Sequence, residues 1–133
     1  MATIPFARWM FVFASSMTLA SVACRRSAVS ADAFSIHEAI TPQPVRIGEA
    51  TVKVQLADNA AQPITNATMM VEADMTHPGM NPVFMAATET APGNYESKIN
   101  FTMGGDWVVL LHIRLGNGVK IERQMDVRDV RPN

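Results

Sequence analysis

From residue 34 onward, apolar and polar side chains alternate one by one along the chain. The clearest stretches are residues 52–56, 69–75 and 107–115, where every second residue is apolar. A strand places successive side chains on opposite faces of a sheet, so this period of two is typical of strands with one buried face. No stretch after residue 34 shows the 3.6-residue period of an amphipathic helix. The sequence therefore predicts an all-β domain.

Turn signals divide the alternating region into seven predicted strands, at residues 34–40, 52–56, 69–75, 82–90, 95–101, 107–115 and 119–127. Pro42 and Pro44 end the first strand, because proline cannot donate to a central ladder. The Pro-Gly pair at 92–93 and the Gly-Asn-Gly run at 116–118 have the composition of tight turns. Short strands separated by regular turns predict a sandwich of two antiparallel sheets. Trp107 is expected at the centre of its core.

The size and charge of the chain narrow its function. Its 133 residues suit one domain, and a formal net charge of −1 gives no basic surface for a phosphate backbone. We therefore expect no nucleic-acid partner. There is no glycine-rich phosphate loop, and acids such as Glu72, Asp74 and Asp106 occur singly at solvent or turn positions. We expect that the protein is not an enzyme.

Residues 1–23 have the layout of a signal peptide. Arg8 is the only charged side chain before an uncharged apolar run at residues 9–23. That run of about 15 residues is shorter than the roughly 20 that a membrane-spanning helix needs. A basic residue, a short apolar run and small residues at its end describe a cleavable signal instead. The segment LASVAC at residues 19–24 resembles the bacterial lipoprotein box, whose cysteine is diacylated and becomes the mature N-terminus.

Cys24 is the only cysteine of the chain, so the protein cannot form an internal disulfide. Lipidation would account for a thiol that is otherwise unexplained in an exported protein. The alternative is ordinary cleavage, after Ala23 or at the small-x-small site at residues 31–33. Lipidation would hold the protein on the periplasmic side of a membrane, with residues 24–34 as a flexible tether and residues 35–130 as the domain. Ordinary cleavage would give a soluble periplasmic protein.

Four elements of the sequence occur in an order that is characteristic of a known family. They are Val-x-Ile-Gly-(x)3-Val-x-Val at residues 45–54, the loop MTHPGM at 75–80, Pro-Gly-x-Tyr at 92–95 and Ile-x-Phe-x-Met-x-Gly-x-Trp at 99–107. Together they resemble the YtkA-like/FixH-like family of exported bacterial domains, over residues 36–128. The resemblance implies an immunoglobulin-like sandwich on the outer side of the cytoplasmic membrane. It also implies an association with metal handling or with the assembly of respiratory oxidases.

The MTHPGM loop carries residues that suit a soft metal. Met75, His77 and Met80 lie within six residues, Met85 follows on the next predicted strand, and Met103 ends another. Cu(I) prefers sulfur ligands and also accepts imidazole, so these five residues are the predicted copper ligands, provided that the strand ends meet. The alternative is packing, because Met75 and Met103 continue the inward register of their strands and methionine fills irregular gaps in cores. His77 and Met80 have no evident packing role.

A second hypothesis for the function involves no metal. Val108, Leu110 and His112 lie on the face of their predicted strand that is opposite to Trp107. An exposed apolar patch there would suit an interaction or assembly module that contacts a periplasmic protein or a membrane complex. His112 is then expected to be a structural or surface histidine.

Overall fold

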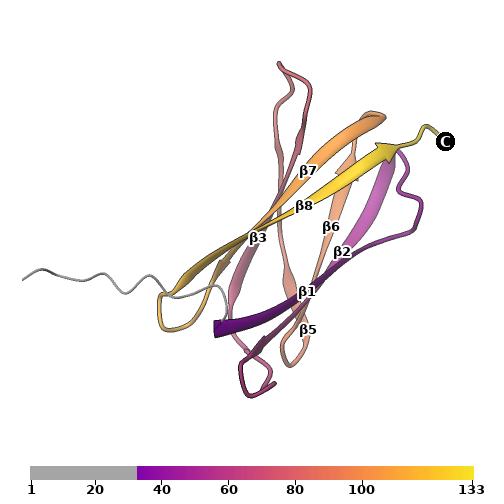
Figure 1. Cartoon of the computed structure of the whole chain (residues 1–133). Coiled ribbons are helices and arrows are strands. Elements are labelled where there is room, and N and C mark those ends of the chain that lie inside the picture. The colour runs from indigo at the N-terminus through magenta and orange to yellow at the C-terminus, as the bar shows by residue number, and fades with distance from the viewer. Residues whose placement is uncertain (1–32) are drawn as a thin grey trace, which may run out of the picture.

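The computed structural model describes residues 33–133, which form eight strands in two antiparallel sheets (Figure 1). The strands are β1 (Phe34–Thr41), β2 (Gly48–Asp58), β3 (Thr68–Met75), β4 (Val83–Ala86), β5 (Thr88–Ala91), β6 (Asn94–Phe101), β7 (Gly105–Arg114) and β8 (Lys120–Val130). Their order is β1-β2-β6-β5 in one sheet and β4-β3-β7-β8 in the other, which is an immunoglobulin-like arrangement. The predicted all-β sandwich is therefore confirmed.

The N-terminal predictions lie outside the described residues. These are the signal peptide at 1–23, lipidation at Cys24 and residues 24–32 of the tether. Within residues 33–133, no helix is long and apolar enough to cross a membrane.

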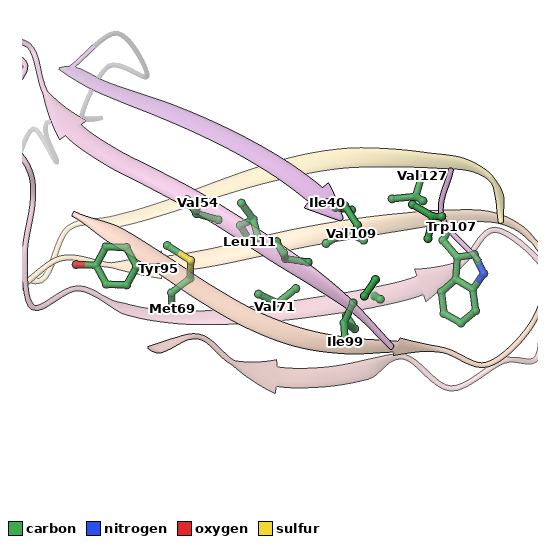
Figure 2. Packing of buried hydrophobic residues seen from close by; sticks show 14 of the residues in the cluster. Ile40, Val54, Met69, Val71, Tyr95, Ile99, Trp107, Val109, Leu111 and Val127 are labelled. Carbon is green, nitrogen blue, oxygen red and sulfur yellow. The ribbon is translucent and has the colours of Figure 1, made fainter. Parts of the chain in front are cut away.

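The buried face of each sheet is the apolar side of the alternation in the sequence. β2 buries every second residue from Ala50 to Leu56, and β7 does so from Trp107 to Ile113. Trp107 is 1% exposed and packs edge-on against Phe101, with ring centres 5.3 Å apart. Figure 2 shows that Trp107 lies at one end of this core, not at the centre where we expected it.

Residues 82–90, expected as one strand, form two strands that belong to different sheets. β4 pairs with β3, whereas β5 pairs with β6. The chain crosses between the sheets at Ala87, whose N–H donates to the carbonyl of Met69 (2.9 Å), and Ser97 Oγ donates to the carbonyl of Ala86 (3.2 Å). Because the backbone stays extended through the crossing, the period of two continues and gives no sign of the change of sheet.

Glu89 of β5 connects two turns at the end of the sandwich where β1 begins. Its carboxylate accepts hydrogen bonds from the N–H groups of Asn66 (2.9 Å) and Gly93 (3.0 Å). Gly93 has a φ of 73°, and a Cβ at this position would lie 2.7 Å from the carbonyl oxygen of Leu56. The β5–β6 turn therefore requires glycine at residue 93.

Tyr95 of β6 holds the loop between β2 and β3. Its hydroxyl donates to the carbonyl of Ile64 (2.8 Å) and accepts from the N–H of Ala67 (3.1 Å). Burial raises the pKa of the Tyr95 phenol above its ordinary value of 10.0; the bond from Ala67 opposes this shift, and the nearby Glu89 carboxylate adds to it. The neutral phenol is the form that fits this site.

Replacing Tyr95 with phenylalanine should lower the free energy of unfolding by about 1–2 kcal/mol at neutral pH, because two part-buried backbone groups lose their partner. The pKa of Tyr95 is raised in the folded state, so the unfolded chain releases the proton first as the pH rises. The stability that the phenol contributes should thus be fully present below pH 10 and decline above it. Denaturant unfolding of both proteins at several pH values measures this difference. A difference that stays constant into the alkaline range would contradict the prediction.

Candidate metal site

Three of the five predicted ligands line one shallow pocket. Met75 ends β3, His77 follows in the β3–β4 loop, and Met103 lies between β6 and β7. β3 and β6 both end at this side of the sandwich, and β7 begins there, because β7 runs antiparallel to β3. In Figure 1 the β3–β4 loop stands at the end of the molecule opposite the start of β1. The condition that the two strand ends meet is therefore fulfilled.

Gly105 leaves room for the side chain of Met75. Met75 lies opposite Trp107 in the register of β3 and β7, and a Cβ on Gly105 would be only 3.0 Å from the Met75 methyl carbon. The β3–β4 loop begins with Thr76, whose N–H and Oγ1 both donate to the carbonyl of Asp106 at 3.1 Å. Met75 itself is half-buried, so its thioether lies between the core and the pocket.

Met103 is not a core residue. Its side chain is 46% exposed, although it continues the register of the buried residues Ile99 and Phe101. β6 ends at Phe101, and the carbonyl of Met103 accepts a hydrogen bond from the indole Nε1 of Trp107 (3.0 Å). The packing interpretation of Met103 is therefore wrong, because the strand on which it depended ends two residues earlier.

Two carboxylates that the sequence did not assign to this site line the same pocket. Asp106 Oδ1 accepts from the N–H of Asp129 (2.9 Å), and Arg128 Nη1 lies 3.8 Å from the other oxygen of Asp106. Asp129 reaches the pocket because β8 pairs with β7, with Gly105 opposite Val130. The sequence pattern contains no signal for that proximity. No group of three or more His, Cys, Asp or Glu among residues 33–133 could hold a metal ion, so a site here would depend on the thioethers.

Met80 and Met85 do not line the pocket. Met80 is half-buried within the β3–β4 loop. Met85 lies on β4 opposite Val71, which is four residues, or about 13 Å of strand, away from Met75 along β3. It is 42% exposed at the edge of the sheet. The pocket thus brings together Met75, His77 and Met103 and leaves out the other two candidates.

His112 lies on the outer face of the β4-β3-β7-β8 sheet, away from this pocket. Its Nε2 is 2.7 Å from Glu72 Oε2, and its Nδ1 is 3.4 Å from Glu122 Oε2. The neighbouring strands place Glu72 on β3 and Glu122 on β8, so His112 is held between two carboxylates. It is a surface histidine with carboxylate partners, and the prediction of a structural or surface role fits this position.

Apolar side chains share this outer face with His112. Phe84 is 53% exposed and Met70 is 39% exposed, while Val108 and Leu110 are half-buried. They face away from the core, because their neighbours along β3, β4 and β7 turn inward. The outer face is therefore a partly apolar surface, which the interaction hypothesis requires.

Residues 36–112, more than half of the chain, match the family described as YtkA-like. The chain belongs to the YtkA-like family. This confirms the predicted resemblance to that family. A search among curated proteins finds no match to this YtkA-like protein.

Two solved structures are similar to this YtkA-like domain in overall shape. The soluble domain of PmoD from Methylocystis sp. (Rockwell) gives a TM-score of 0.47 at 12% identity, covering 74% of this chain and 90% of that chain. Murine CRIg gives a TM-score of 0.41 at 10% identity, covering 75% of this chain and 98% of that chain. These likenesses are too remote to indicate a shared function, and the fold assignment depends on the strand order described above.

Because Met103 is exposed, we expect this YtkA-like domain to fold without the thioether of that residue. Replacing Met103 with alanine should change the free energy of unfolding by less than about 1 kcal/mol, as is usual for surface positions. Replacing Met69, which is 1% exposed, with alanine should lower the free energy of unfolding by about 2–5 kcal/mol, because the change leaves a cavity in the core. Denaturant unfolding of the two variants measures the contrast. Equal losses would mean that Met103 packs as a core residue.

Proposed function

We propose that this YtkA-like protein is an exported, lipid-anchored domain that binds Cu(I), or hands it on, through Met75, His77 and Met103. The observation that carries the proposal is that these three residues, from two segments that are far apart in the sequence, line one accessible pocket. Two thioethers and one imidazole form a donor set that suits a soft ion such as Cu(I). Thioethers also avoid the disulfide formation to which thiols are liable in an oxidising compartment.

The surroundings of the pocket support a cation of low charge. The exposed carboxylates of Asp106 and Asp129 add negative charge at its rim, and Arg128 and Arg131 each form an ion pair with one of them. This leaves little net field for attracting a strongly charged ion. Selectivity would then depend on the sulfur donors, which favour a soft monovalent metal over hard divalent ones.

The position of the pocket suits transfer from an anchored protein. A lipid on Cys24 would hold the chain from the side where β1 begins, and the β3–β4 loop, which carries His77 of the pocket, lies at the other end (Figure 1). The eight residues of β1 span about 26 Å, so the pocket would face away from the membrane surface. A partner protein in the periplasm could approach it without displacing the anchor.

An anaerobic Cu(I) titration against a chromogenic chelator tests the proposed site, with the exported protein purified from cells. The wild type should withhold one equivalent of Cu(I) from the chelator. The Met75→Leu/Met103→Leu variant keeps the side-chain volume but removes both sulfurs. It should weaken Cu(I) binding by more than tenfold, because loss of a residue that only hydrogen-bonds to a metal ligand already weakens binding by about tenfold or more. Met85→Leu is the matched control, because Met85 lies outside the pocket.

Two further variants define the ligand set. His77→Ala should weaken binding, whereas Met80→Leu should not if Met80 stays outside the site. No competition by the wild type would overturn the copper proposal. Met75 would then have a packing role, and the function would lie in protein contacts of the kind that the apolar outer face allows.

Replacing Cys24 with alanine tests the anchor independently of the metal. The variant should move from the membrane fraction to the soluble periplasmic fraction and should lose labelling by a fatty-acid analogue, because its acyl chains are what hold it to the bilayer. Fractionation and labelling of cells that express each form measure both effects. Identical behaviour of wild type and variant would mean that the protein is secreted by ordinary cleavage.

A further inference from the structure

The outer face of the β4-β3-β7-β8 sheet carries basic side chains at one end and mainly acidic side chains, with Arg128 among them, at the other. Arg114 and Lys120 are opposite each other in the β7–β8 register, and within residues 33–133 their side chains have no ion-pair or hydrogen-bond partner. At the other end Asp74 is likewise without a side-chain partner in the described chain, and Asp126 shares Arg128 with a second carboxylate. Six residues of strand, about 20 Å, separate the two ends.

Between these ends, apolar side chains share the face with Gln124, which donates to Asp126, and with the cluster of His112, Glu72 and Glu122. Phe84 and Met70 are exposed, and Leu110 is half-buried beside them. Glu72 lies 2.7 Å from the ring of His112, so this pair needs no partner from another molecule. A shallow hollow beside Met70 and His112 extends toward the basic end of the face.

We propose that this face binds a second copy of the chain, related by a two-fold axis that lies in the interface, perpendicular to the strands, at the level of Leu111. Rotation about this axis reverses the strand direction, so the basic end of each copy meets the acidic end of the other. Lys120 then lies over Asp126 of the second copy, and Arg114 lies beside the second copy's Asp74. A two-fold interface must be complementary to itself, and this charge layout fulfils that condition.

The same rotation fits the apolar middle of the face. It places Leu110 of each copy over the hollow beside His112 of the other, and it brings the two Phe84 side chains to the same flank of the interface. A two-fold axis parallel to the strands would instead bring the basic ends of the two copies to the same end of the interface, where like charges repel. The charges therefore select one of the two possible face-to-face dimers.

The size of the face predicts how strong the dimer is. Four strands about 4.8 Å apart, over about 20 Å of their length, give a flat footprint of roughly 400 Å² per copy, which is below the roughly 800 Å² per partner of a standard specific interface. The dimer should therefore be weak and reversible, with a Kd in the upper micromolar range.

Sedimentation equilibrium of the exported protein purified from cells, with a metal chelator present, tests the dimer. Arg114→Glu and Asp74→Arg should each raise the Kd by about tenfold or more, and the double variant should restore it, because the two charges exchange places across the axis. Neither residue has a side-chain partner within the described chain, so neither change breaks an existing ion pair. Gln55→Glu, on the outer face of the other sheet, is the matched control, because Gln55 is exposed and has no side-chain partner within the described chain.

A zero-length carbodiimide cross-linker tests the geometry directly. It joins an amine to a carboxylate in contact, so it should link Lys120 to Asp126, which lie about 20 Å apart within one copy and can react only between copies. Mass spectrometry of the digested dimer identifies the linked peptides. A protein that is monomeric up to about 1 mM would overturn the proposal. A dimer that is insensitive to the charge variants and yields no Lys120–Asp126 link would overturn it as well.

Discussion

The two sheets are held together by apolar packing without a covalent link, since the single cysteine of the chain cannot form an internal disulfide. Trp107 is the largest buried side chain and lies at one end of that packing. Its indole N–H donates a hydrogen bond to the carbonyl of Met103. A buried indole needs a partner for this group. Because the partner is a backbone carbonyl of the β6–β7 loop, the packing of the core also determines the path of the loop that carries Met103.

The candidate metal pocket thus depends on the fold in a specific way. Trp107 lies opposite Met75 in the strand register and is bonded to the Met103 backbone, so one core residue is connected to both sulfur-bearing positions. Gly105 provides the space that Met75 occupies. A rigid support of this kind is what a binding site needs in order to hold its donors ready for the ion. At the opposite end, Tyr95 and Glu89 secure the turns in a similar manner.

Much of the fold could be predicted from the sequence because strands with one buried face have a simple period. The inward residues of β3 and β7, and those of β2 from Val52 to Leu56, were foreseen from alternation, whereas the buried Ala50 of β2 lies before the predicted strand. The crossing at Ala87 was not, because an extended chain keeps its period when it changes sheets. The site was foreseen only in part. The exposure of Met103 depends on where β6 ends, and Asp129 reaches the pocket only through the pairing of β7 with β8. Alternation specifies faces, whereas pairing and strand ends depend on the whole fold.

The crossing at Ala87 also affects how the protein resists aggregation. On that side of the sandwich, the edge strands β4 and β5 have only four residues each, which is too short to serve as a good template for another chain. On the other side, β1 is followed by two prolines, and Glu38 forms an ion pair with Arg123 of β8 across the gap between the sheets. Short edges, prolines and charges are the features by which natural sheets prevent unwanted strand addition. A small domain without a disulfide is thereby protected on the edges where it would otherwise polymerise.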